Sequence, residues 1–129
     1  DVVRFTLAYN QGASFSVSLG EHTRWILTAL ALGVLAVLMM QYRRAAAHDR
    51  TLALALALIV AGASGNLLDR LRSPRGVVDF IDIGIGDLRF YTFNLADVAV
   101  FCGAILLANL LIRRDREEAI GTLPPPTPT

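Results

Sequence analysis

The sequence predicts an α-helical transmembrane bundle that carries a small antiparallel β-sheet at one membrane face. Of its 129 residues, 54% are hydrophobic, which exceeds the roughly 45–50% usual in soluble domains. Three apolar stretches approach the ~20 residues that cross the hydrocarbon core of a bilayer. Between these stretches apolar residues recur at every second position, a period that is typical of strands. We therefore expect a multispanning membrane protein whose strands lie outside the bilayer.

The three membrane spans are expected over residues 23–42, 51–68 and 93–112. The second span contains Ala61 and Gly65, a small-residue spacing that permits close helix packing but often occurs by chance. Residues 113–129 form a polar tail with a proline-rich end, which we expect to be disordered. The membrane-embedded domain is accordingly predicted over residues 1–112.

Two β-hairpins are expected, over residues 2–19 and 77–92, because apolar and polar residues alternate in both segments. Two spans separate the hairpins, so both must lie on the same side of the membrane, where they are expected to join in one sheet. The arginines near the span ends are equal in number on the two sides, so the positive-inside rule gives no orientation. The acids between residues 69 and 87 lower the net charge on the hairpin side, which weakly favours the outer face.

Polar pairs interrupt the apolar spans at the membrane face that carries the hairpins. Asn66 and Asp69 end the second span, and Asn94 and Asp97 begin the third, each pair at a spacing of three residues. A carboxylate within a span costs at least ~2.5–3.5 kcal/mol at the bilayer centre, less near the interface, and usually marks a functional pathway. A third acid, Asp79, lies on the predicted strand among apolar neighbours. These residues are the candidates for chemistry.

Asp79 and Asp97 are predicted to act as a pair of carboxylates that activate water to attack a peptide carbonyl. Two acids held ~3 Å apart do not both ionise, so one serves as general acid and the other as base. Asp97 near a helix N-terminus is expected to be the anion, and burial should favour the neutral form of Asp79.

Simpler interpretations remain for several of these residues. Asn94 could cap the third helix with Asp97 in its first turn, and Asp69 could form an interfacial ion pair with Arg70. Asn10 has the pattern of a turn residue. The two histidines lack metal-ligand spacing, and the single cysteine cannot form an internal disulfide. The 12 cationic residues nearly balance the 11 acids, which makes nucleic acid an unlikely partner.

Four ordered blocks together resemble the lipoprotein signal peptidase (signal peptidase II) family. They are residues 10–15 (NQGASF), 65–70 (GNLLDR), 76–80 (GVVDF) and 93–97 (FNLAD). The resemblance implies a membrane aspartic endopeptidase that removes signal peptides from diacylglyceryl-modified prolipoproteins, just before the lipidated cysteine. It implies a multi-pass protein of the bacterial cytoplasmic (inner) membrane, with its active site at the outer face.

The resemblance also implies roles for individual residues. Asp79 and Asp97 would be the catalytic dyad, while Asp69 would have a supporting role. Polar residues lining the substrate site would be Asn10, Asn66, Arg70 and Asn94. The family needs no metal or organic cofactor; membrane lipids are expected partners, and the cyclic peptide globomycin is its characteristic inhibitor.

The chain differs from the family in the number of spans, because members usually have four and three are predicted here. The sequence is therefore expected to be either truncated or a shortened homologue. Two alternative functions follow: a noncatalytic homologue that binds lipoproteins, and a small transporter subunit in which Asp69 and Asp97 line a polar pathway.

Overall fold

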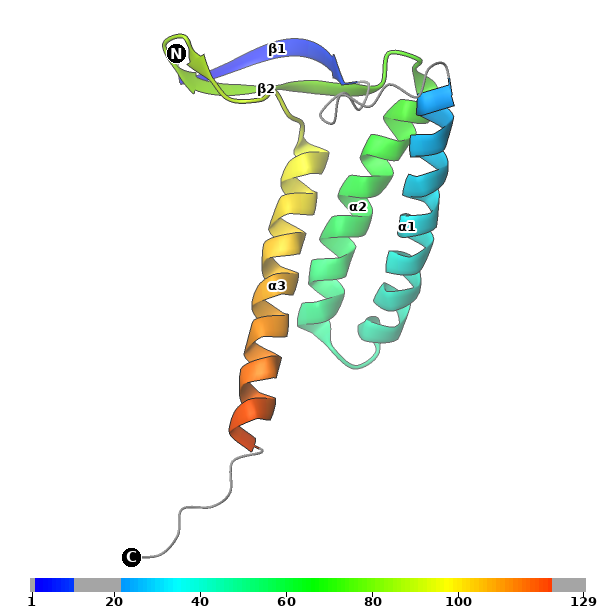
Figure 1. Cartoon of the computed structure of the whole chain (residues 1–129), viewed down its shortest axis with the longest axis vertical. Helices are drawn as coiled ribbons and strands as arrows, with labels where there is room; N and C mark the ends of the chain where they lie inside the picture. The colour runs from blue at the N-terminus through cyan, green and yellow to red at the C-terminus, as the bar shows by residue number, and fades with distance from the viewer. Residues whose placement is uncertain (1, 11–21, 122–129) are drawn as a thin grey trace, which may run out of the picture.

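Three long helices stand side by side beneath a small sheet that lies across one end of the bundle (Figure 1). The computed structural model describes residues 2–10 and 22–121. The elements in chain order are β1 (Val3–Asn10), α1 (Thr23–Ala46), α2 (Arg50–Arg72), β2 (Val77–Ile85), β3 (Leu88–Arg89) and α3 (Leu95–Gly121). The middle helix is α2, which packs against both α1 and α3. The predicted helical bundle with a sheet at one face is confirmed.

Each of the three described helices is long and apolar enough to cross a membrane. All three extend beyond the predicted spans, because polar residues continue the helix outside the apolar stretch. The difference is largest for α3, which continues to Gly121. The prediction of a disordered tail is therefore wrong for residues 113–121, while residues 122–129 lie outside the described part. Helix α2 stops at Arg72, just before the Ser73-Pro74 pair that resists helical geometry.

Close packing of α2 against α3 depends on glycines. A Cβ at Gly62 would collide with the backbone oxygen of Ala96, and a Cβ at Gly103 would lie 2.7 Å from the backbone oxygen of Ala55. Because glycine has no Cβ, the two helix backbones can approach closely at these positions, as small residues allow between membrane helices. The expected Ala61 and Gly65 spacing is only half right, since Gly65 faces Ala96 but Ala61 is exposed. The tight α2–α3 contact positions the start of α3 beside the end of α2.

The sheet has the strand order β1-β2-β3, with both pairings antiparallel. The predicted hairpin over residues 77–92 is present as β2 and β3, which turn at Gly86 in a left-handed conformation with φ of 59°. The predicted turn after Asn10 and the strand that follows it lie outside the described residues. Within the described part, β1 pairs with β2, so the two predicted hairpin segments share one sheet on one membrane face.

A β-bulge changes which side chains of β1 face the helices. Phe5 lies opposite Ile81, but Ala8 lies opposite Asp79, so β1 contains one extra residue between these pairs. Side chains of paired residues point to the same side of a sheet. The bulge therefore moves Asn10, rather than its neighbour Tyr9, onto the face that carries Asp79.

The segment before α3 is attached to the middle of β2. Phe93 and Ile81 form an antiparallel bridge, in which each backbone N–H donates to the other residue's carbonyl, at 3.0 and 2.8 Å. This bridge places Asn94 and the first turn of α3 directly below β2. At the opposite membrane face, Asp49 caps α2 by accepting from the Leu52 N–H at 2.9 Å and forms an ion pair with Arg114 of α3.

Candidate active site

The site is built around the beginning of α3, where Asn94 and Asp97 cap one another. The Asp97 N–H donates to Asn94 Oδ1 at 3.0 Å, and the Asn94 N–H donates to Asp97 Oδ2 at 3.1 Å. This reciprocal pattern is a capping box, which satisfies backbone donors that the helix itself leaves unpaired. The capping interpretation of Asn94 is therefore confirmed. The reciprocal cap also leaves the other polar side-chain atoms of both residues facing neighbouring residues.

The cap fixes the orientation of two side-chain amides. Because Asn94 Oδ1 accepts from the helix backbone, its Nδ2 must face away, where it donates to Asp79 Oδ1 at 2.8 Å and to Asn66 Oδ1 at 3.1 Å. Asn66 Oδ1 is thus an acceptor, and its Nδ2 donates to Asp97 Oδ1 at 2.8 Å. The bonds close a ring through Asn94, Asn66 and Asp97 with one possible direction. Asp97 of α3 is part of this ring, and Asp79 of β2 is hydrogen-bonded to it through Asn94. The two acids therefore lie beside one another.

Asp79 is a buried acid. It is 3% exposed, and its neighbour on the same face of β2, Val77, is equally covered. Burial raises the pKa of the Asp79 carboxyl above its ordinary value, and the negative charge of Asp97 raises it further. Hydrogen bonds from Asn94 and Asn10 lower the same pKa, as does the charge of Arg70. The direction of the shift agrees with the expectation that burial favours the neutral form of Asp79.

Asp97 occupies a different environment. It lies in the first turn of α3, at the positive end of the helix dipole, and each of its carboxylate oxygens accepts one N–H bond. Each oxygen retains further acceptor capacity, so the carboxylate is able to bind water as well. A buried acid with a raised pKa, next to a carboxylate with open acceptor positions, is a pair suited to general acid–base chemistry.

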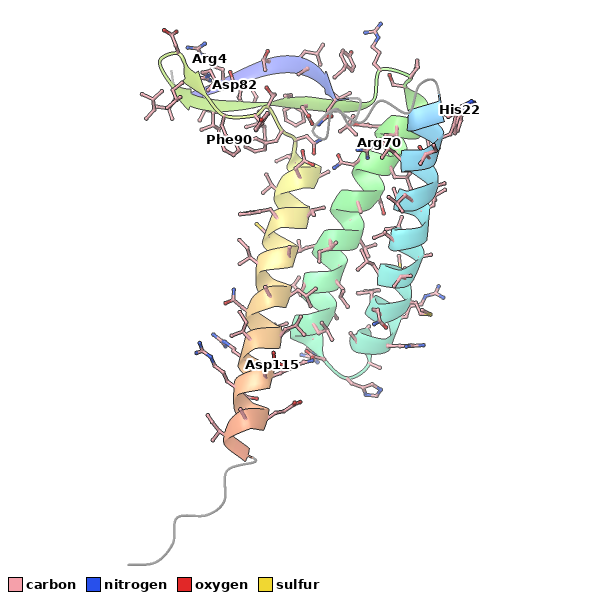
Figure 2. The ribbon with its side chains drawn as sticks, in the orientation of Figure 1. Arg4, His22, Arg70, Asp82, Phe90 and Asp115 are labelled. Atoms are coloured by element: carbon pink, nitrogen blue, oxygen red, sulfur yellow. The ribbon has the colours of Figure 1, made fainter. Side chains whose placement is uncertain are left out.

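Arg70 lies one helical turn after Asn66 and donates to its backbone oxygen at 3.3 Å. Figure 2 shows Arg70 at the end of α2 nearest the sheet. Asn10 reaches the site from β1, across the sheet, through its hydrogen bond to Asp79. Both residues therefore act on the Asp79 carboxyl, as expected of residues that line one site. Asn10 is the final residue of β1. The turn predicted after it lies outside the described residues.

Asp69 is directed toward the sheet. Its Oδ2 accepts a hydrogen bond from the Val78 N–H at 3.1 Å, so it attaches the end of α2 to the beginning of β2. This contact fixes the strand one residue before Asp79. This position is compatible with a supporting role for Asp69, which stays a prediction, and it gives Asp69 a hydrogen bond to the strand backbone.

Sequence reasoning did not identify the contact that anchors the end of β1. Arg75, between α2 and β2, donates to the Tyr9 hydroxyl at 3.3 Å, and its guanidinium lies 5.1 Å from the centre of the Tyr9 ring. This combination of a hydrogen bond and a cation–π contact fixes the residue before Asn10. The bulge in β1 was equally hidden, because nothing in its composition interrupts the strand pattern.

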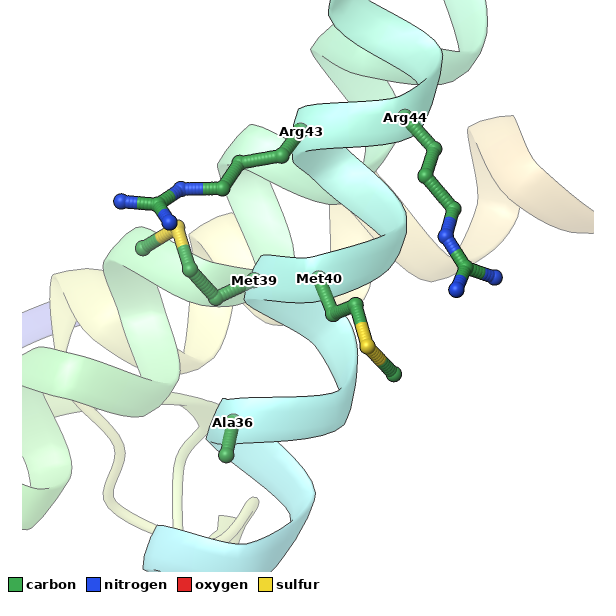
Figure 3. A pocket seen from close by; sticks show the side chains of 5 residues that line it. All are labelled: Ala36, Met39, Met40, Arg43 and Arg44. Atoms are coloured by element: carbon green, nitrogen blue, oxygen red, sulfur yellow. The ribbon is translucent and has the colours of Figure 1, made fainter.

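A shallow pocket of about 600 Å³ lies far from these residues, on the end of α1 remote from the sheet. It is lined by Ala36, Met39, Met40, Arg43 and Arg44, whose side chains Figure 3 shows on one helix. The pocket therefore lies toward the opposite end of the bundle from Asp79 and Asp97. Within the described part of the chain, no cluster of three or more His, Cys, Asp and Glu side chains has the arrangement of a metal site.

Comparison with known proteins gives the family. The family model described as signal peptidase (SPase) II matches residues 1–113. The chain belongs to the signal peptidase II family. Lipoprotein signal peptidase of Burkholderia mallei (strain SAVP1) is 42% identical over 113 residues, which are 86% of this chain and 67% of that protein. The protein of the same name from Burkholderia multivorans is 42% identical over 112 residues, covering 85% and 66% of the two chains.

Two solved structures of bacterial membrane enzymes are similar to this chain. A bacterial membrane enzyme determined by the in meso method at 1.9 Å resolution has a TM-score of 0.69 and 33% identity, covering 85% of this chain and 69% of that one. A second, at 2.3 Å resolution, has a TM-score of 0.69 and 28% identity, covering 98% and 73%. The chain thus spans about two thirds to three quarters of these relatives and membrane enzymes. The match to the family model covers the sheet, α1, α2 and α3 as far as residue 113.

Proposed function

We propose that this chain is a membrane aspartic endopeptidase that removes signal peptides from prolipoproteins, with Asp79 and Asp97 as its catalytic dyad. The observation that carries the proposal is the ring of side-chain amides that holds the two acids together. Asn94 donates to Asp79, and Asn66 donates to Asp97, at 2.8 Å each. Membership of the signal peptidase II family supports the substrate class, the removal of signal peptides from prolipoproteins.

The proposed reaction begins with Asp79 protonated and Asp97 ionised. Asp97 takes a proton from water as the water oxygen attacks the scissile carbonyl carbon, and Asp79 gives its proton to the carbonyl oxygen. When the tetrahedral intermediate collapses, Asp97 passes its proton to the leaving nitrogen and Asp79 recovers the proton of the hydroxyl group. Both acids return to their initial states. The pair titrates as a unit, so its pH dependence belongs to both residues together.

The position of the site at the end of a membrane bundle suits a lipid-anchored substrate. A diacylglyceryl-modified prolipoprotein lies in the bilayer, and its signal helix would approach α2 and α3 laterally while the sheet limits access of bulk water. We place the protein in the bacterial cytoplasmic (inner) membrane with this site at the outer face, and Asn10, Asn66, Arg70 and Asn94 around the bound peptide. Globomycin would then compete with the substrate for the same position.

The transporter alternative fits the helix packing poorly. A polar pathway between α2 and α3 would need space, whereas Gly62 and Gly103 bring these two helices into backbone contact. The noncatalytic alternative predicts binding of prolipoprotein without cleavage. An assay that measures both binding and cleavage therefore distinguishes it from the peptidase.

The experiment is single-turnover cleavage of a diacylglyceryl-modified prolipoprotein by the purified protein in lipid. It compares this chain, a form extended to the full length of its relatives, and the Asp79→Asn and Asp97→Asn variants. Each substitution should abolish cleavage and leave the fold largely intact, because an amide is nearly isosteric with a carboxyl but does not exchange the proton. Asp97→Asn also loses one of the two acceptor oxygens that bind Asn66 and the Asn94 N–H, so a modest loss of thermal stability is expected for that variant. The double variant should be scarcely worse than either single one, since the residues act as a unit. Near-normal cleavage by either folded single variant would refute the dyad.

A further inference from the structure

The sheet extends beyond the helices that support it. Along the lower face of β2, Val77 is 2% exposed and Asp79 is 3% exposed, but Ile83 is 38% exposed and Ile85 is 77% exposed. The beginning of the strand therefore lies over the bundle and its end does not. Figure 1 shows β1, β2 and the turn that follows β2 projecting sideways past the top of α3.

The projecting part has one apolar face. Strand pairing places Val3 opposite Ile83 and Leu88 opposite Ile85, and Phe90 donates its backbone N–H to Ile83 at 2.7 Å. Because paired residues point to the same side, these side chains share the face of Ile83 and Ile85. The apolar underside consists of six exposed residues, Val3, Phe5, Ile83, Ile85, Leu88 and Phe90.

The opposite face of the same projection is charged. Arg4 pairs with Asp82, and Asp82 forms a salt bridge with Arg89 at 2.8 Å. Figure 2 shows Arg4 on the outer side of the sheet and Phe90 on the side from which α3 descends. A group of exposed apolar residues on one face of a sheet whose other face is charged is typical of a contact surface.

Apolar side chains are exposed at the start of α3 as well. Leu95 and Phe101, in the first turns of that spanning helix, are 66% and 65% exposed. The underside faces along α3, toward the bilayer that α3 enters, and lies at the level of its first residues. We propose that the apolar underside inserts into the lipid at the boundary between headgroups and acyl chains, so that the sheet is held on the membrane surface.

This inference rests on the membrane-spanning helices and the sheet, and does not depend on peptidase activity. Its consequence for the site is mechanical, because Asp79 is on the same strand as Ile83 and Ile85. A sheet anchored by lipid keeps this strand at a fixed depth relative to the membrane surface.

The test places tryptophan on each face of the projection. The chain has one tryptophan, Trp25, so all variants are made in a Trp25→Phe background. Phe5→Trp and Ile85→Trp report on the apolar underside. Arg4→Trp, on the same strand and the opposite face, is the matched control. Each full-length variant is reconstituted in phosphatidylcholine vesicles whose acyl chains carry bromine either near the headgroup or near the terminal methyl, and circular dichroism checks the fold.

Insertion predicts that tryptophan at position 5 or 85 has blue-shifted emission and is quenched most strongly by bromine near the headgroup. The Arg4→Trp control should remain unquenched by bromine and accessible to acrylamide. Equal acrylamide quenching on both faces, without quenching by bromine, would overturn the proposal. Protection of the underside from both quenchers would also overturn it, and would instead indicate contact with another protein segment or a second copy.

Discussion

Asn94 and Asp97 satisfy each other's backbone at the start of α3, with the Asp97 N–H donating to Asn94 Oδ1 at 3.0 Å and the Asn94 N–H donating to Asp97 Oδ2 at 3.1 Å. A helix cap and a catalytic candidate are thus the same pair of residues. The requirement that Asn94 Oδ1 accept from the helix is also what turns its Nδ2 toward Asp79. Helix formation and arrangement of the two acids are therefore coupled.

Substitution of Asn94 should separate these two roles. Serine retains a side-chain oxygen that caps a helix, whereas alanine does not, so Asn94→Ala should be about 1 kcal/mol less stable than Asn94→Ser. Both changes remove the amide donor to Asp79 and Asn66, so both should lose most of the cleavage activity. Thermal unfolding in detergent and single-turnover cleavage measure the two effects. Wild-type cleavage by Asn94→Ser would show that the amide is unnecessary.

Substitution of Asp69 should affect folding through the Val78 N–H. Asp69→Ala removes the acceptor at 3.1 Å and leaves that backbone donor unpaired, which costs about 1–3 kcal/mol where it is buried. Asp69→Asn keeps an oxygen in the same position and serves as the matched control. Denaturation midpoints in detergent should fall for Asp69→Ala and change little for Asp69→Asn. Equal stability of the two variants would contradict the proposed attachment of α2 to β2.

Stability should depend on pH through Asp79. Burial raises the pKa of this carboxyl above its ordinary value of 3.8, so the folded protein binds the proton more readily than the unfolded chain. The stabilising effect of protonation is complete below the unfolded pKa and is lost as the pH rises through the folded pKa. Wild-type stability should therefore fall over this interval relative to Asp79→Asn, which has no proton to lose. The measurement is the unfolding temperature of both proteins at a series of pH values. The same pH dependence for wild type and Asp79→Asn would refute the raised pKa.

Substitution of the packing glycines should displace α3. An added methyl group at Gly103 would meet the Ala55 oxygen and the Ile59 side chain, both at 2.7 Å, while one at Gly62 would collide with Ala96. Overpacking of this kind costs about 1–3 kcal/mol. Gly62→Ala should also reduce cleavage, because Ala96 is adjacent to Asp97.

Gly33→Ala is the matched control for the glycine substitutions, since a Cβ at Gly33 has no neighbour within 4 Å. It adds the same methyl group within a spanning helix and should leave thermal unfolding and cleavage near wild-type values. A loss of stability equal to that of Gly103→Ala would indicate a general effect of alanine in these helices, and the packing explanation would fail.

Several features of this protein followed from its sequence because they depend on local chemistry. Apolar length predicted the three spans, and period-two alternation predicted strands at the sheet. The number of spans between the hairpin segments required both to lie on one face. The order and spacing of the motifs indicated the family and identified Asp79, Asp97 and the asparagines as candidate site residues. The end of α3 was predicted less well, because residues 113–121 continue an existing helix despite their polarity.

Only the tertiary structure decided how those residues meet. The extra residue between Phe5 and Ala8 turns Asn10 toward Asp79, and a one-residue shift of this kind leaves no reliable trace in an alternating pattern. The direction of the amide ring was equally hidden, because it depends on Asn66, Asn94 and Asp97 from two helices that glycine contacts hold together. Sequence determined which groups are present and on which membrane face, whereas long-range packing determined which atoms donate, which accept and which acid is buried.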